Sequence, residues 1–231
     1  MKLLKPLKHE TFETFLSLHK ISDTMNELEI LFRQHTGEKL LSKEELSASG
    51  SNRRYFRLES KNTSLIGVAG TSKEENQAFI TMAKHFRTKG IPVPEFLSQT
   101  PDGLFYIQED IGNTLLFDFI AEGRKTGVFC EPEKEMLRKT MRLLPAIQVK
   151  GAEDFDFSVC YPQPEFNERS ILWDLNYFKY CFLKSTGLEF QENRLEDDFQ
   201  HLSDILLQNS SNTFMYRDFQ SRNVMVKDNE P

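Results

Sequence analysis

Two kinds of hydrophobic pattern alternate along the first hundred residues. A helical period over residues 23–35 ends at Gly37, a residue type that commonly caps helix C-termini. Residues 40–48 look extended, and Tyr55, Phe56 and Leu58 begin a second strand. The small polar residues at 49–52 lie between these two runs, so this part of the chain is predicted to form a β-hairpin.

The pattern continues with three further strands and a helix. Residues 64–69 form an apolar run typical of a buried strand. The following helix has apolar positions spaced by three and four residues, at Phe79, Met82, Ala83 and Phe86. Residues 91–94 and 104–108 predict two more strands, joined through a turn at residues 101–103. A β-rich N-terminal lobe is therefore expected.

After residue 112 the pattern becomes mostly helical, which gives an α+β chain of two lobes. We predict an N-terminal extension over residues 1–22, a β-rich lobe over 23–112 and a helical lobe over 113–231. Pro132 suits the start of the first helix of this lobe, and Pro145 is expected to kink or end it.

Three apolar stripes mark the helices of the second lobe, and we predict that all of them pack in its core. The stripes consist of Met136, Leu137, Met141 and Leu144; of Ile171, Leu172, Leu175, Phe178 and Phe182; and of Leu195, Phe199, Leu202 and Leu206.

Composition narrows the class of protein. The formal charge is −6, and no long Lys/Arg run is present, so a nucleic-acid partner is not expected. The chain lacks the roughly 20 consecutive apolar residues of a membrane span and the apolar stretch of a secretory signal. We predict no membrane partner and a cytoplasmic location. Cys130, Cys160 and Cys181 are expected to be reduced, partly buried thiols, since their number and spacing fit neither disulfides nor zinc.

The segment from Phe214 to Val226 carries the most specific chemistry. A polar loop with Asp218 and, five residues later, Asn223 lies between two apolar runs, which predicts a strand, a loop and a second strand. Phosphoryl transfer requires a carboxylate that orients and deprotonates the acceptor hydroxyl, and an oxygen ligand for Mg²⁺. Asp218 and Asn223 are the candidates for these roles. The alternative is a surface loop in which Asp218 caps a turn.

This loop resembles the catalytic loop of the aminoglycoside phosphotransferase and choline kinase family, which has a protein-kinase-like fold. The similarity lies in Tyr216-Arg217-Asp218 and Asn223-Val224-Met225-Val226, although Tyr216 replaces the usual histidine. The resemblance implies a catalytic Asp218, Mg²⁺ bound by Asn223, and ATP bound between the lobes. A protein kinase is disfavoured, because the region between Gly112 and Phe214 is too long and too helical.

A second segment is similar to the nucleotide-covering loop of bacterial N-acetylmuramate and N-acetylglucosamine anomeric kinases of this family. It runs over residues 47–57 and resembles their pattern G-x-x-S-x-R-R-Y-x-R. The resemblance implies ATP contacts from Ser49, Gly50, Ser51, Arg53 and Arg54. The alternative is an ordinary polar turn with solvated arginines.

Further correspondences complete the implied nucleotide site. The hinge would offer backbone groups of Glu109 and Ile111 to adenine, and Glu75 would be the acidic residue that normally pairs with a phosphate-binding lysine. Residues 65–70 contain no lysine, so the phosphate charge would have to be met by Arg53, Arg54, Lys73 or metal. Residues 172–178 resemble the helix that helps to wall the acceptor pocket of these sugar kinases.

The implied function is ATP-dependent transfer of phosphate to a hydroxyl of a small metabolite, a sugar or amino sugar. The family carries a second metal-binding aspartate shortly after the catalytic loop, and residues 227–231 look like the turn that leads to it. We therefore expect the fold to be incomplete at its C-terminus and the chain to be inactive as given. The alternative is a catalytically inactive kinase-like module that binds a nucleotide or a partner.

Overall fold

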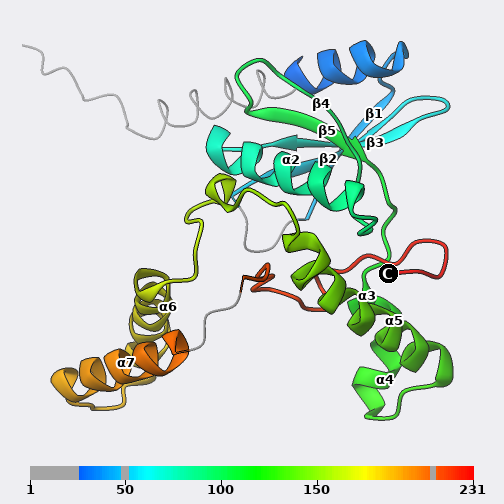
Figure 1. The fold of residues 1–231 in the computed structure, drawn as a ribbon. Coiled ribbons are helices and arrows are strands. Elements are labelled where there is room, and N and C mark those ends of the chain that lie inside the picture. The colour runs from blue at the N-terminus through cyan, green and yellow to red at the C-terminus, as the bar shows by residue number, and fades with distance from the viewer. Residues whose placement is uncertain (1–25, 48–51, 209–211) are drawn as a thin grey trace, which may run out of the picture. The chain divides into compact units, whose positions relative to one another are not determined.

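The computed structural model describes residues 26–47, 52–208 and 212–231 (Figure 1). The described residues divide into two compact units. The first unit holds the residues up to Leu115 together with Met225–Glu230, and the second holds Leu116–Val224 with Pro231. The predicted combination of a β-rich and a helical part is confirmed. The assignment of nucleotide binding to one part and of catalysis to the other stays a prediction.

The first unit contains a five-stranded antiparallel sheet, in the order β1-β2-β3-β5-β4. Its strands are β1 (Ser42–Leu46), β2 (Arg54–Glu59), β3 (Ser64–Ala69), β4 (Phe96–Gln99) and β5 (Phe105–Glu109). On the central strand, Val68 of β3 lies opposite Tyr55 of β2 and Tyr106 of β5. The hairpin of β1 and β2 predicted from the sequence is present, and its tip at residues 48–51 lies outside the described residues.

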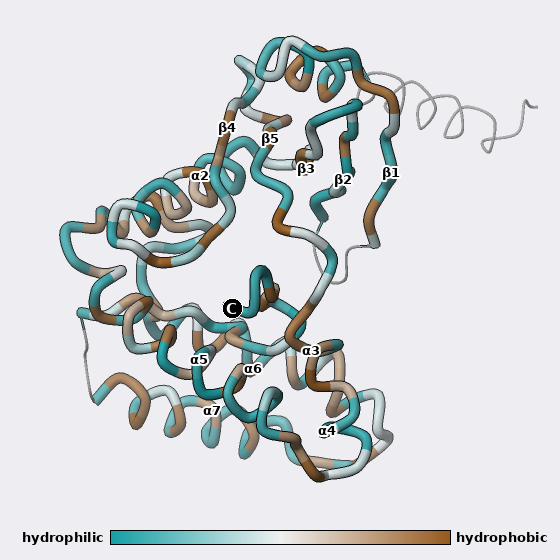
Figure 2. Tube along the Cα trace, turned by 90° about the vertical axis from the view of Figure 1, so that its right-hand side faces the viewer, coloured by the Kyte–Doolittle hydropathy of each residue, from teal (hydrophilic) through white to brown (hydrophobic). Residues whose placement is uncertain are grey.

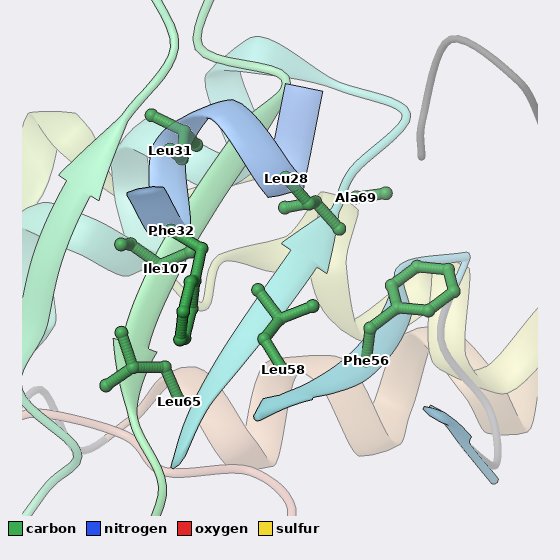
Figure 3. Packing of buried hydrophobic residues seen from close by; sticks show 8 residues of the cluster. All are labelled: Leu28, Leu31, Phe32, Phe56, Leu58, Leu65, Ala69 and Ile107. Atoms are coloured by element: carbon green, nitrogen blue, oxygen red, sulfur yellow. The ribbon is translucent and has the colours of Figure 1, made fainter. Parts of the chain in front are cut away.

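A helix covers each face of this sheet, which explains why the central strand is apolar throughout. On one face, a helix over residues 26–36 packs Phe32 near Leu65 and Leu28 near Ala69, both of β3, in one hydrophobic cluster (Figure 3). On the other face, Ile80 of α2 (Lys73–Thr88) packs against Val68. Since successive strand residues face opposite sides, a strand covered on both sides needs apolar residues at consecutive positions.

Two predictions at the edges of the first unit are settled by backbone chemistry. Residues 91–94 form no strand, which corrects the prediction, and β4 begins only at Phe96. Pro92 and Pro94 have no N–H to donate to a ladder, so this stretch cannot pair as a strand does. The predicted C-cap is confirmed: the N–H of Gly37 bonds to the carbonyl of Arg33 at 2.9 Å, and Gly37 has a φ of +72°.

The second unit is helical. Its helices are α3 (Leu116–Phe119), α4 (Ala121–Thr126), α5 (Glu131–Gln148), α6 (Glu168–Cys181) and α7 (Glu192–Leu207), with short 3₁₀ turns at Lys150–Ala152, Phe157–Val159 and Leu183–Thr186. Pro132 lies in the first turn of α5, as predicted. Pro145 lies in the last turn of α5, which ends at Gln148, in keeping with its expected effect on the helix.

The apolar stripes of the second unit are only partly buried, which corrects the prediction that all of them pack in the core. Met136, Ile171 and Phe199 are buried as expected. Several other members are exposed, namely Met141, Phe178, Phe182, Leu202 and Leu206. Hydrophobic positions recur along both α6 and α7 (Figure 2), and the contact between the two helices covers only part of each stripe.

The cysteines and helices bear on two further expectations. All three cysteines are free, but Cys130 and Cys181 are exposed and only Cys160 is partly buried, where burial raises the pKa of its thiol. The prediction of partly buried thiols is therefore wrong for two of the three.

Among the described helices, none combines the length and the apolar character needed to cross a membrane.

Candidate functional site

Asp218 and Asn223 lie on one self-braced loop of the second unit. The side-chain nitrogen Nδ2 of Asn223 donates to the backbone carbonyl of Asp218 at 3.0 Å. The N–H of Gln220 donates to the same carbonyl at 2.9 Å, and the N–H of Asn223 donates to the carbonyl of Gln220 at 2.8 Å. Because the Asn223 nitrogen is engaged in this way, its Oδ1 is the atom oriented away from the bond and able to accept or to ligate.

Helix α3 supports the second half of the loop. The N–H groups of Leu116 and Phe117 donate to the carbonyls of Val224 and Ser221 at 2.8 and 3.0 Å. The guanidinium of Arg222 lies over the ring of Phe117 at 4.2 Å from its centroid. These contacts fix the end of the loop that carries Asn223 against a regular element.

The loop is not flanked by two strands, which corrects the prediction. Met225 forms a single isolated bridge with Leu115, and the N–H of Phe214 donates to the carbonyl of Gln148 at 2.8 Å. The apolar runs on either side of the loop therefore make isolated backbone hydrogen bonds, and neither run forms a β-ladder with another described segment. Periodicity alone does not reveal whether a partner strand exists.

The residues before Asp218 show how the loop is oriented. Burial raises the pKa of the Tyr216 hydroxyl, with a further contribution from the negative charge of Asp218. The ring of Tyr216 meets the edge of Phe219 at 5.3 Å. Arg217 forms an ion pair with Asp174 of α6, so the loop is tied to that helix. Asp218 itself is exposed, as a base that must reach a bound acceptor has to be.

In the first unit, Arg53 and Glu75 form an ion pair. Nη2 of Arg53 lies 3.1 Å from Oε1 of Glu75, and Nη1 donates to the hydroxyl of Tyr106 at 3.4 Å. The guanidinium also lies over the ring of Phe79, 5.4 Å from its centroid. Both predicted residues therefore meet at one place, whereas Tyr106 and Phe79 were missed, because nothing in their strand or helix pattern distinguishes them from core residues.

The neighbouring arginine has a different partner. Arg54 donates from Nε and Nη2 to the two carboxylate oxygens of Glu45 on β1, both at 2.7 Å. Because Arg54 is bound to Glu45 in this bidentate pair, it is not part of the group that Arg53 forms with Glu75, Tyr106 and Phe79. Ser49, Gly50 and Ser51, which were predicted to cover the phosphates, lie outside the described residues.

The predicted hinge is braced by charged groups. Asp110 accepts hydrogen bonds from Arg57 at 2.7 and 3.1 Å, from Ser64 at 2.5 Å and from the N–H of Gly112 at 2.9 Å. Burial alone would raise the pKa of the Asp110 carboxyl, but these hydrogen bonds outweigh burial and hold the pKa below its ordinary value. The network fixes the backbone on either side of Ile111.

Glu109 is held on the same stretch of chain. Its N–H donates to the carbonyl of Glu95 at 2.8 Å, and the N–H of Glu95 donates to the Glu109 carboxylate at 3.3 Å. Lys227 donates to that carboxylate at 2.8 Å and, as the largest influence, lowers the pKa of Glu109. Backbone groups of Glu109 and Ile111 are the ones that the sequence resemblance assigned to adenine.

Residues 227–230 form the turn expected from the sequence. Lys227 and Glu230 exchange two backbone hydrogen bonds of 2.9 Å, and the two residues between them, Asp228 and Asn229, have φ values of +52° and +62°. Positive φ at both central positions is the pattern of a type I′ hairpin turn. Asp228 is therefore a turn residue, as predicted, and the ion pair of Lys227 with Glu109 was missed.

Magnesium would find few protein ligands in this loop. Within the described part of the chain, no group of three or more His, Cys, Asp and Glu side chains could hold a metal ion. Asn223 fits the position of a single oxygen ligand, because its Nδ2 is committed to Asp218. Mg²⁺ is commonly bound by one or two protein oxygens together with substrate phosphates, so the loop fits an ion that arrives with a nucleotide.

The comparisons with known proteins concern mainly the fold. No protein-family model and no curated protein sequence matches the chain. Among solved structures, a thermostable variant of the aminoglycoside phosphotransferase APH(4)-Ia matches with a TM-score of 0.55 and 14% identity, over 87% of this chain and 68% of that chain. The chain has the kinase-like fold of the aminoglycoside phosphotransferases.

Two ternary complexes give the same result. A structure of APH(2")-IIa with streptomycin and ATP matches with a TM-score of 0.53 and 12% identity, over 98% of this chain and 69% of that chain. A ternary complex of a thermostable APH(4)-Ia variant with AMP-PNP and hygromycin B matches with a TM-score of 0.55 and 14% identity, over 88% and 68% of the two chains. At these identities the similarity establishes the fold alone.

Proposed function

We propose that this chain is an ATP-dependent phosphotransferase that moves the γ-phosphate to a hydroxyl of a small metabolite, a sugar or amino sugar. The observation that carries the proposal is the hydrogen bond from Asn223 to the carbonyl of Asp218. This bond gives a carboxylate and an amide oxygen a fixed separation on one rigid loop, in a chain with the fold of known phosphotransferases.

In the proposed reaction, Asp218 accepts the proton of the acceptor hydroxyl as the oxygen attacks the γ-phosphorus of ATP. The bond between the γ-phosphorus and the bridging oxygen breaks, and ADP leaves. Magnesium would neutralise phosphate charge when it is bound with ATP, and Oδ1 of Asn223 would be its ligand from this loop. The ion pair of Arg217 with Asp174 holds the segment just before Asp218 and thereby orients the base.

The first unit would bind ATP. The carbonyl of Glu109 and the N–H of Ile111 would contact adenine, and the braced Asp110 keeps that stretch of backbone in place. Ser49, Gly50, Ser51 and Arg53 are the residues proposed to bind the phosphates, whereas Arg54, which the sequence resemblance also assigned to them, is paired with Glu45. Solved neighbours of the same fold include complexes with ATP and with AMP-PNP, which supports the choice of nucleotide.

A hydroxylated ring is the acceptor class that the surroundings of Asp218 favour. Asp174 is exposed beside the loop and can accept hydrogen bonds from hydroxyl or ammonium groups. Tyr177 lies three residues further along α6, on the same side of the helix, and is also exposed. Two solved neighbours are complexes with the small molecules streptomycin and hygromycin B.

The test is a coupled assay of ADP release with sugars, amino sugars, choline-like alcohols and aminoglycosides. We expect one class, the sugars, to stimulate ADP release well above the background of ATP hydrolysis. Stimulation by choline or by aminoglycosides alone would overturn the acceptor class. Binding of ATP with no turnover for any acceptor would instead favour the alternative of an inactive nucleotide-binding module.

A further inference from the structure

The central strand β3 lacks the basic residue that a kinase normally uses against the phosphates. Residues Ser64–Ala69 read S-L-I-G-V-A, without a lysine or arginine. In protein kinases, a lysine on this strand pairs with a carboxylate of the first-lobe helix, and the pair must be in place for phosphoryl transfer. In this chain the carboxylate is present as Glu75 on α2, but its cation comes from Arg53, at the start of the neighbouring strand.

The carboxylate of Glu75 is firmly positioned. Ser72 caps the helix by accepting the N–H of Glu75 at 3.1 Å. The next residue, Asn76, is buried and donates to the carbonyls of Gly103 and Leu104 at 2.9 and 3.1 Å. The first turn of α2 is therefore bonded to the turn between β4 and β5, which holds the backbone of Glu75 in place, and the ion pair with Arg53 holds its carboxylate.

Arg53 is held from three sides. Only 17% of its side chain is exposed, compared with 27% for Glu75. Its guanidinium meets the Glu75 carboxylate, the fully buried Tyr106 and the ring of Phe79. Burying a cation is costly unless it is paired. The guanidinium of Arg53 is paired and mostly buried, so its charge is held in one place, unlike that of a solvated surface arginine. Arginine also has a planar fork of donors, so one edge can face a carboxylate while another faces an anion.

We infer that Arg53 is the phosphate-binding cation of the nucleotide site, in place of the missing strand lysine, and that Glu75 and Tyr106 are its positioning residues. The inference rests on the proposed function and deepens it. Arg53 directly follows residues 49–52, the segment that resembles a nucleotide-covering loop. Loop and cation would thus be adjacent in sequence, whereas the kinase lysine lies on a separate strand.

The other cations considered from the sequence are less suited to this role. Arg54 is committed to both oxygens of Glu45. The stem of Lys73 lies against Gly103, where an added Cβ would be 3.1 Å from its Cγ, and the residue is exposed. Of these three, only Arg53 combines a fixed position with a carboxylate partner on α2.

The test compares the binding of Mg-ATP and of adenosine by calorimetry, since adenosine lacks phosphates. Arg53→Met is expected to weaken ATP binding by about tenfold to a hundredfold, the range of a charge-assisted hydrogen bond, with adenosine affinity unchanged. Glu75→Gln should lower the ratio of ATP to adenosine affinity in the same direction, by a smaller factor. Arg53→Lys should restore part of that ratio, because it keeps the charge but not the fork.

Lys84→Met is the matched control, because Lys84 is an exposed cation over an aromatic ring, at 4.5 Å from the centroid of Phe96, on the same helix as Glu75. It should leave both affinities unchanged. A purely structural role for Arg53 would lower ATP and adenosine affinity together, and that result overturns the inference. An unchanged ATP affinity in both Arg53 variants overturns it too. Should Arg53→Met fail to fold, the ratios for Arg53→Lys and Glu75→Gln decide in the same way.

If the proposed phosphotransferase function is itself wrong, the binding measurements give a different result. A wild-type protein that binds neither ATP nor adenosine would refute the proposed phosphotransferase and the inference with it. A wild-type protein that binds ATP more tightly than adenosine, with the same ratio in the Arg53 variants, would refute the inference alone.

Discussion

At the scale of single residues, Asp218 can be separated experimentally from the groups that hold the nucleotide. In an active preparation, Asp218→Asn should lower turnover by about 10²- to 10⁴-fold, because the amide cannot accept the proton of the acceptor hydroxyl. The affinity for ATP should change little, since a base acts mainly in the transition state. The ADP-release assay and calorimetry with ATP measure the two quantities.

A matched comparison is Asp156→Asn, which changes an exposed carboxylate outside the proposed site that caps a short turn in the second unit. It should leave turnover within about twofold of wild type, because Asp156 has no proposed role in the reaction. Near-normal turnover in the Asp218 variant would remove that residue from the role of base. A fall in ATP affinity equal to the fall in turnover would point to a binding role instead.

Asn76 allows a stability prediction at one buried position. Its Nδ2 is the donor to the carbonyls of Gly103 and Leu104, so Asn76→Ala leaves both buried acceptors without this partner. We expect the free energy of unfolding to fall by about 2 kcal/mol. Urea denaturation measures the change. Asn62→Ala is the control, because Asn62 is exposed in a turn, and it should cost less than about 0.5 kcal/mol. Equal effects of the two substitutions would contradict the assigned role of Asn76.

The sequence indicates which residues meet where the contact is local, and it does not where the contact depends on distant partners. The spacing of Asp218 and Asn223 was sufficient to propose their roles, because five residues of one loop determine how they meet. The partner of Glu75 was not predictable. Arg53 lies on another element, and only the pairing of strands and the packing of α2 bring the two side chains together.

At the scale of elements, the hinge after β5 should give the first unit an acid-sensitive stability. The side chain of Asp110 is only 9% exposed, and its pKa is held below the ordinary value although burial opposes this. The unfolded chain therefore binds a proton to Asp110 at a higher pH than the folded chain does. The contribution of Asp110 to stability is present above the unfolded pKa of about 3.9 and is lost as the pH falls through the lower folded pKa.

We expect Asp110→Asn to be less stable than wild type at neutral pH and the gap in melting temperature to shrink as the pH falls below about 4. Thermal melts recorded across this range test the sign. Asp118→Asn changes an exposed carboxylate and should show no such narrowing. A constant gap between wild type and Asp110→Asn at every pH would show that the Arg57–Asp110 pair does not depress the pKa.

The elements themselves show which sequence signals were sufficient. Strand β3 has the predicted bounds, because a run buried on both faces is apolar at every position and ends at polar residues. Residues 91–94 and the run before Asp218 were wrongly predicted as strands. Apolar character is common to strands and to buried irregular segments, and only the available partner N–H and carbonyl groups distinguish them.

At the scale of the whole molecule, the described chain consists of two compact units, each with buried residues of its own. The α+β class and the kinase-like fold were predictable, because long periodic segments identify their element type and the loop around Asp218 resembles a known motif. Burial in the second unit was not predictable in full. A stripe of apolar residues on α7 indicates a face, but how much of that face is covered depends on the element packed against it, as exposed Leu202 and Leu206 show.

Because each unit contains buried residues of its own, we predict that the two units respond independently to destabilising substitutions. Trp173 is the only tryptophan, lies on α6 and is 53% exposed, so its fluorescence reports the second unit. Hydrogen exchange of peptides from β3 reports the first unit. Phe199→Ala removes a buried ring from α7 and should cost about 3–5 kcal/mol in the second unit.

Phe199→Ala should therefore shift the unfolding midpoint of Trp173 fluorescence and leave the exchange of β3 peptides unchanged, whereas Asn76→Ala should do the reverse. Each variant is the control for the other, because both remove a buried side chain but in different cores. The reasoning is that a substitution lowers the stability of the cooperative unit that contains it, and chains with several compact units do not always unfold in one step. If both variants shift both probes by the same amount, the chain unfolds as a single cooperative unit and the independence of the two cores is refuted.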